Sequence, residues 1–274
     1  MPPKLGILAG GGILPARLIE HCNAIGRPHY VVALDGHCDA ATVQNVPHDW
    51  FRIGAAGAIL AALHREGAAD LVMVGRIHRP RIRDLRLDAK GWLILARIWR
   101  RFFAGDDGLL RAVASVLEDE GFHVRGIHEV MDSVLASVGA LGRVQPDADA
   151  QRDIAEGVRT ARDLGRRDVG QAVIVQGGRL IAQESAKGTD ELLKRSAGLL
   201  SGVGGVLVKM RKPQQDRRID LPAIGPDTVR RAAEIGLRGI AIEAGHALVL
   251  DLPEVVRLAD DAGLFLFGIA ADDI

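Results

Sequence analysis

Short apolar runs alternate with segments of helical periodicity along the whole chain of 274 residues, and this pattern constrains the fold more than any other feature. In the first half, apolar runs at 5–8, 30–34 and 71–74 indicate strands. Helical spacing follows the first run from Pro15 and returns near residue 59 and at 109–117, and alternation over 122–130 predicts a further strand. Strands that alternate with helices of about ten to fifteen residues predict a mostly parallel sheet covered by helices.

The residue pattern changes at the start of the second half. Glycine, proline and aspartate interrupt the periodicity over 140–152, which predicts a linker and a division into domains 1–142 and 143–274. Gly177 and Gly178 join two apolar runs in a predicted hairpin, and the runs at 240–242 and 248–250 predict a second hairpin. We therefore expect an α/β protein of two domains, the first Rossmann-like with a mostly parallel sheet and the second with a mixed sheet and hairpins.

Charge and cysteine content narrow the function classes. The chain carries 35 basic and 35 acidic residues, so the molecule as a whole does not attract polyanions, and we expect no nucleic-acid partner. Cys22 and Cys38 have no partners at zinc-ligand spacing and do not form a disulfide framework. No signal peptide and no apolar stretch of about 20 residues is visible, which predicts a cytoplasmic protein.

A glycine loop follows the first predicted strand. Gly10, Gly11 and Gly12 precede a predicted helix, where bare backbone N–H groups and the helix dipole favour an anion such as phosphate. Pro15 stands where the dinucleotide fingerprint has its third glycine, and Asp35 lies near the end of the second strand. The loop is about equally compatible with a tight turn that needs small residues. An NAD(P)-dependent oxidoreductase is the alternative function that this loop supports.

A basic and aromatic segment extends from Arg76 to Arg101. At helical spacing Trp92, Trp99 and Phe103 share one face with Leu95, and Arg97 with its neighbouring arginines shares another. That arrangement is typical of a helix that lies on anionic lipid. A core helix with solvated arginines remains the alternative.

Acidic and cationic residues follow the predicted strands of the second half. They are Glu184, Asp190 (in Gly188–Asp190, with Thr189, at a predicted helix start), Lys209, Lys212, Asp216 and Asp220. Carboxylates suit Mg²⁺ and ammonium groups suit phosphate charge, so the set predicts metal-assisted attack on a diphosphate. For any single carboxylate a capping or surface role is the alternative, and Glu243 is equally compatible with a hairpin and a site.

The same residues belong to a set of motifs distributed over nearly the whole chain. The motifs are Gly6–Gly12 with Leu14 and Pro15, Asp70–Gly75, Gly105–Asp107 with Leu109–Arg111, Glu120–Phe122 with His128–Val130, Asp168–Val173, Gly188–Asp190, Gly205–Lys209, Asp220–Pro222 with Ile224–Pro226 and Thr228, and Glu243–Gly245. In this combination the sequence resembles the LpxI-type UDP-2,3-diacylglucosamine diphosphatases of lipid A biosynthesis in Gram-negative bacteria.

The resemblance implies an enzyme whose two domains embrace the substrate. It implies Mg²⁺ dependence, water attack on the sugar-side phosphorus, and the products UMP and 2,3-diacylglucosamine 1-phosphate. It makes Asp220 the leading catalytic and metal-associated residue, with Lys209 and Asp190 as further catalytic residues and Glu184 as a second metal ligand. The expected substrate-binding residues are Gly10, Gly11, Gly12, Gly75, Arg76, Gln171, Thr189, Lys212 and Thr228.

The resemblance also implies where the protein works. The lipid substrate places it peripherally at the inner face of the cytoplasmic membrane. A homodimer is compatible with the sequence, which does not determine the oligomeric state. A module that binds the lipid or the nucleotide without catalysis is a third class of function, and it predicts binding without turnover.

Overall fold

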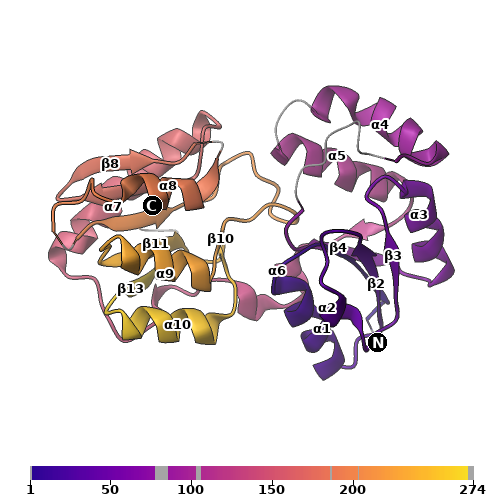
Figure 1. Cartoon of the computed structure of the whole chain (residues 1–274), viewed down its shortest axis with the longest axis horizontal. Coiled ribbons are helices and arrows are strands. Elements are labelled where there is room, and N and C mark those ends of the chain that lie inside the picture. The colour runs from indigo at the N-terminus through magenta and orange to yellow at the C-terminus, as the bar shows by residue number, and fades with distance from the viewer. Residues whose placement is uncertain (1, 78–85, 103–105, 186, 203, 271–274) are drawn as a thin grey trace. The chain divides into compact units, whose positions relative to one another are not determined.

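The computed structural model describes residues 2–77, 86–102, 106–185, 187–202 and 204–270. The chain forms two compact units (Figure 1). The first contains Met1–Asp132 together with the short segment Asp216–Asp220, and the second contains Ser133–Gln215 and Leu221–Ile274. The second unit therefore begins at Ser133 rather than at residue 143.

The sheet of the first unit is parallel and five-stranded, in the order β3-β2-β1-β4-β5. The strands are β1 (Leu5–Ala9), β2 (His29–Leu34), β3 (His48–Phe51), β4 (Asp70–Val74) and β5 (His123–Val124). The three central strands are almost wholly buried, as expected for strands that are covered on both faces. The strand order reverses between β1 and β4, which is the switch point of a Rossmann-like fold. The predicted fold class of this half is confirmed.

Helices connect these strands. They are α1 (Leu14–Ala24), α2 (Ala40–Val43), α3 (Ala56–Arg65), α4 (Ala89–Phe102), α5 (Asp106–Asp119) and α6 (Ile127–Val130), followed by the 3-10 turn η2 (Asp132–Val134). The strand predicted over 122–130 is present only as β5, and the rest of that range is not a strand. Gly126 is the N-cap of α6, and its N–H donates to the Glu129 carboxylate at 2.8 Å. This cap stabilises a helical turn where the alternation of residue types indicated a strand.

The main sheet of the second unit is mixed and six-stranded, in the order β6-β13-β11-β9-β7-β8. Its strands are β6 (Gly139–Ala140), β7 (Ala172–Gln176), β8 (Arg179–Gln183), β9 (Val206–Lys209), β11 (Gly239–Glu243) and β13 (Phe265–Ile269). Strands β9, β11 and β13 are parallel, whereas β6, β7 and β8 each pair antiparallel with a neighbour. The pairing of β6 with β13 explains why the second unit starts before the predicted linker.

One predicted hairpin is present and the other is wrong. β7 and β8 pair through Gly177 and Gly178, whose φ angles are +58° and +71°. β11 does not pair with β12 (Leu248–Val249). It lies between β9 and β13, and β12 pairs instead with β10 (Ala223–Ile224) in a separate sheet. Strand β11 is buried along most of its length, which suits a central strand better than one arm of a hairpin.

Helices cover both faces of this sheet (Figure 1). They are α7 (Ala148–Arg166), α8 (Gly188–Ser196), α9 (Pro226–Glu234) and α10 (Leu252–Asp261). Alternate residues of β7 face opposite cores. Val173 and Val175 pack in the cluster that contains α7, whereas Ile174 packs in the cluster that contains the other three helices. Because successive side chains of a strand point to opposite faces, β7 packs against both layers of helices at once.

Candidate active site

In the first unit the glycine loop lies at the switch point of the sheet. Gly11 forms an antiparallel bridge with Arg76, which follows β4, so the structure brings two of the predicted substrate-binding stretches together. The N–H of Gly10 donates to Val74 O at 2.8 Å, and the N–H of Gly11 donates to Arg76 O at 2.9 Å. These two N–H groups are thus occupied by protein carbonyls. Any phosphate contact of the loop has to come from its other groups.

Close backbone packing explains why this loop needs glycine. A Cβ on Gly10 would lie 2.6 Å from Arg76 O, and a Cβ on Gly11 would lie 2.7 Å from His37 O. Gly75 has φ +96°, and a Cβ there would lie 2.8 Å from the Gly10 carbonyl carbon. Gly12 has φ +90° with open space beside it. The tight-turn interpretation therefore has direct structural support.

In the second unit, the carboxyl end of β9 carries a buried hydrogen-bonded group of side chains, here called the Lys209 network (Glu184, Thr189, Lys209). The Lys209 ammonium donates to Thr189 Oγ1 and to the Ala223 carbonyl, both at 2.9 Å. The Thr189 hydroxyl donates to Glu184 Oε1 at 2.7 Å. Lys209 and Glu184 are only 6% and 4% exposed, so this is a charged network held largely out of solvent. Its members were all predicted as site residues, and the structure brings them together.

The register between β7 and β9 explains why the residues of the Lys209 network lie together. β7 runs antiparallel to β9 with Ala172 opposite Lys209, so Gln171 lies beside the end of β9. The Gln171 N–H donates to Glu184 Oε2 at 2.7 Å, and the Met210 N–H donates to Gln171 O at 2.9 Å. The side-chain Oε1 of Gln171 is buried without a hydrogen-bond partner among the described residues. Such an atom is suited to a ligand or an ordered water.

Residues at the carboxyl ends of β9 and β11 extend this edge of the sheet. Glu243 is the last residue of β11, and Arg211 follows β9 by two residues. The Arg211 N–H donates to Glu243 Oε2 at 3.0 Å, and the Arg211 Nε is buried without a partner among the described residues. Sequence reasoning missed Arg211 and left Glu243 open. Their position at the carboxyl ends of parallel strands was the available signal, because ligands bind there.

Other predicted residues have local partners. The Lys212 ammonium pairs with Asp168 at 2.9 Å, and exposed Asp190 pairs with Arg231 at 3.1 Å. Thr228 lies in the first turn of α9, where its hydroxyl accepts from the Gly225 N–H at 3.4 Å. These contacts stabilise a loop and two helix ends, and the predicted roles of the three residues in catalysis or binding stay predictions.

Asp220 ends the short segment 216–220 that belongs to the first unit. Ile219 packs against the hydrophobic core of that unit, and Arg218 pairs with both Asp216 and Glu118 of α5. Arg218 holds the pKa of the Asp216 carboxyl below its ordinary value. The Asp220 side chain is partly exposed. Anchored residues on its N-terminal side and Pro222 on the other limit the freedom of its backbone.

The basic and aromatic segment is only partly described. Within α4, Leu95 is buried whereas Trp92 and Leu93 are 62% and 70% exposed, so Trp92 and Leu95 do not share one environment as expected. Arg97 pairs with Asp119 at 2.6 Å. The arginines at 79–83 and the side chains of Trp99 and Phe103 lie outside the described residues. Within the described part of the chain, no helix is long and apolar enough to cross a membrane.

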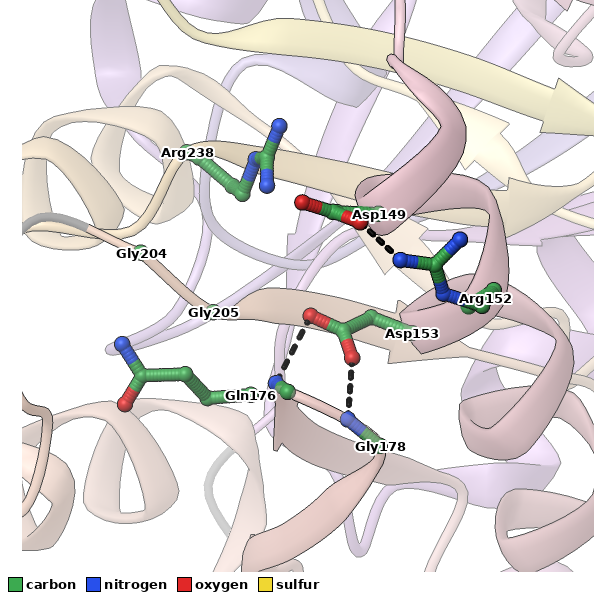
Figure 2. Close-up of a pocket in the computed structure, with 9 residues that line it drawn as sticks. Asp149, Arg152, Asp153, Gln176, Gly178, Gly204, Gly205 and Arg238 are labelled. Carbon is green, nitrogen blue, oxygen red and sulfur yellow. Dashed lines mark hydrogen bonds and ion pairs between the residues drawn. The ribbon is translucent and has the colours of Figure 1, made fainter.

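A cavity of about 540 Å³ opens at the other end of the second unit's sheet (Figure 2). It lies beside Gly205 and Arg238, which precede β9 and β11, and beside the β7–β8 turn. Asp153 accepts from Gly177 N–H at 3.2 Å and from Gly178 N–H at 2.6 Å, and Asp149 pairs with Arg152. Asp153 thus holds the β7–β8 turn, Asp149 lies at the start of α7, and none of the sequence-predicted site residues is among the described residues that line this cavity.

Comparisons with known proteins cover both units. Residues 4–134 match the family described as LpxI N-terminal domain, and residues 137–267 match the LpxI C-terminal domain. The chain is 41% identical over 273 residues to the UDP-2,3-diacylglucosamine pyrophosphatase LpxI of Caulobacter vibrioides, and the match covers 97% of each chain. This chain belongs to the LpxI family.

Proposed function

We propose that this protein hydrolyses the diphosphate of UDP-2,3-diacylglucosamine and releases UMP and 2,3-diacylglucosamine 1-phosphate. The name of the Caulobacter relative, at 41% identity over almost the whole chain, supports this activity. The families matched and this relative give the oxidoreductase alternative no support. The glycine loop adds none, because Gly10 and Gly11 use their N–H groups within the fold.

The observation that carries the proposal is the position of the Lys209 ammonium. It donates to the carbonyl of Ala223, which follows Asp220 by three residues. Lys209 is only 6% exposed and lies at the carboxyl end of β9, where α/β proteins bind ligands. A desolvated cation of this kind suits the stabilisation of phosphate charge that diphosphate hydrolysis requires.

The proposed bond changes are those that the resemblance implies. A water oxygen forms a bond to the sugar-side phosphorus and gives up a proton to solvent, and the bridging P–O bond to UMP breaks, with its electron pair leaving on UMP. Lys209 stabilises the negative charge that develops on the phosphoryl oxygens, and Asp220 is the carboxylate assigned to the attacking water or to the metal. Gln171, whose Oε1 has no hydrogen-bond partner among the described residues, is available for a polar group of the substrate.

Mg²⁺ is part of the proposal, and Asp220 is better suited than Glu184 to bind it. Asp220 offers a hard oxygen donor on a partly exposed side chain. Both carboxylate oxygens of Glu184 already accept hydrogen bonds, from the Gln171 N–H and the Thr189 hydroxyl. No group of three or more His, Cys, Asp or Glu residues suited to a metal occurs among the described residues. One carboxylate with substrate phosphates is a common way to hold Mg²⁺, and the bound ion would offset diphosphate charge there.

The acyl chains of the substrate place the reaction at a membrane surface, and we infer a peripheral position at the inner face of the cytoplasmic membrane. Exposed Trp92 and Leu93 on α4 support a contact with lipid. The pairing of Arg97 with Asp119 offsets the charge of one arginine of this helix.

Hydrolysis in water enriched in ¹⁸O tests both the activity and the phosphorus attacked. We expect UMP release from UDP-2,3-diacylglucosamine with the label in the sugar 1-phosphate. Label in UMP would place the attack on the uridine-side phosphorus. Binding of the lipid without any turnover, at every Mg²⁺ concentration tried, would contradict the enzymatic proposal and favour a binding module.

A further inference from the structure

The hydroxyl of Thr189 joins two buried charges. A threonine hydroxyl has one hydrogen to donate and lone pairs to accept with. Thr189 donates its hydrogen to Glu184 Oε1 at 2.7 Å, so a lone pair faces the Lys209 ammonium, which donates to it at 2.9 Å. The direction of this chain is set by Glu184, because a carboxylate only accepts. Lys209 is thereby held by an oriented acceptor rather than by a freely rotating one.

The second oxygen of Glu184 fixes the carboxylate itself. Oε2 accepts from the Gln171 N–H at 2.7 Å, and the Glu184 N–H donates to Ala172 O at 2.8 Å. A Cβ on Gly170 would lie 2.9 Å from the Glu184 Cβ, which shows how closely the two strand ends pack here. Glu184 is therefore held at both ends, with one hydrogen bond to each carboxylate oxygen, and it belongs to no group of three or more metal-ligating side chains among the described residues.

We propose that Glu184 is a positioning residue for the reaction and not a metal ligand. It orients the Thr189 hydroxyl, which together with the Ala223 carbonyl holds the Lys209 ammonium at the carboxyl end of β9. This inference rests on the proposed function, since it assigns to Lys209 the stabilisation of phosphate charge. It deepens that function by giving two carboxylates different roles. Glu184 positions the Lys209 ammonium, whereas Asp220 acts on the attacking water or binds the metal.

Glu184→Gln is the direct test. The amide keeps the size of the side chain but has one acceptor oxygen instead of two, so either the Thr189 hydroxyl or the Gln171 N–H loses its acceptor and the network is no longer held at both ends. We expect kcat to fall by about 10-fold to 10²-fold, as for the loss of a hydrogen bond to a charged group, with KM changed less than kcat. Thr189→Val should lower kcat similarly, and Thr189→Ser, which keeps the hydroxyl, should retain most of it. The double variant Glu184→Gln/Thr189→Val should be little worse than the weaker single variant, because both changes break one chain of bonds.

Asp153→Asn is a matched control. Asp153 is also a buried carboxylate, 3% exposed, that accepts two hydrogen bonds in the same unit, but at the opposite end of the sheet. We expect it to lower the melting temperature as Glu184→Gln does, and to leave kcat at the wild-type value. Equal losses of kcat in both variants would overturn the positioning role and indicate a structural one.

The Mg²⁺ dependence distinguishes positioning from ligation. In Glu184→Gln we expect the Mg²⁺ concentration that gives half-maximal activity to stay within about twofold of wild type. A rise of about tenfold or more, with kcat restored at saturating Mg²⁺, would show that Glu184 is a ligand. Unchanged kcat in Glu184→Gln would also overturn the inference. If wild type itself releases no UMP, the proposed function fails, whereas active wild type with equally active variants contradicts only the role of Glu184.

Discussion

The backbone N–H of Asp220 donates to the carbonyl of Asp216 at 3.0 Å and closes the turn that ends the segment 216–220. Three residues later the chain enters β10, whose Ala223–Ile224 pair with β12 in the second unit. A carboxylate on so constrained a stretch of backbone is held towards one direction at low entropic cost. Constraint of this kind is what a group that acts in a transition state requires.

Asp220→Ala should lower kcat by about 10²-fold or more while the lipid still binds, because a group of this type stabilises the transition state more than the ground state. A purely structural Asp220 would instead cost about 1 kcal/mol of unfolding free energy and little rate. Single-turnover rates measured beside thermal melting distinguish these results. A variant that melts earlier but hydrolyses normally would contradict a catalytic role.

Activity should require Mg²⁺ or a similar hard cation and should be lost in EDTA, because oxygen donors and diphosphate oxygens prefer such ions. Re-addition of Mg²⁺ should restore the rate of UMP release. If Asp220 holds the ion, Asp220→Asn should need more Mg²⁺ for half-maximal activity than wild type. Full activity in chelator would contradict the metal requirement.

Gly10→Ala should lower the free energy of unfolding by about 1–3 kcal/mol, the usual cost of forcing atoms into a packed site. The new Cβ would lie 2.6 Å from Arg76 O. Gly165→Ala, within α7, is the control, since its Cβ meets neighbours at 3.4 Å or more and alanine favours the helix by about 0.5–1 kcal/mol. Urea denaturation measures both. Unchanged stability of Gly10→Ala with a raised KM would favour the phosphate-loop interpretation instead.

His128 should make stability depend on pH. Burial, followed by the nearby Arg217, lowers the pKa of His128 from its ordinary value of about 6.5. The unfolded chain therefore takes up the proton first as the pH falls. The contribution of His128 to the free energy of unfolding is complete above about pH 6.5 and is lost as the pH falls through the folded-state pKa. His128→Gln should flatten this dependence, measured by urea denaturation between pH 7.5 and 5 (roughly the range in which histidine titrates). Equal slopes in both proteins would contradict it.

Trp92→Ser with Leu93→Ser should weaken binding to vesicles that contain anionic phospholipid and leave the fold intact, because both side chains are exposed. Leu95→Ser, on the buried side of the same helix, should instead lower the melting temperature. Vesicle sedimentation and thermal melting check the two outcomes. Unchanged sedimentation of the double variant would contradict a lipid contact by α4.

The sequence alone determined the features that depend on neighbouring residues. The apolar runs at β1, β2 and β4 identified a parallel sheet because strands buried on both faces need continuous apolar side chains. Gly177 with Gly178 identified the β7–β8 turn, since both adopt positive φ. Pro226 marked the start of α9 for a similarly local reason, because its fixed φ suits the first position of a helix.

Only the tertiary structure decided what depends on register between distant strands. β11 and β12 carry runs that suit a hairpin, yet β11 pairs with β9 and β13 because a central position buries both of its faces. Glu184 and Asp220 are both carboxylates after apolar runs, and their surroundings differ. Glu184 accepts two hydrogen bonds in a buried network, whereas Asp220 ends a segment that packs with the other unit. Residue type alone made both carboxylates candidates for the same role. Only the hydrogen-bond partners that folding brings to each of them distinguish Glu184, which we propose positions Lys209, from Asp220, which we propose acts on the water or the metal.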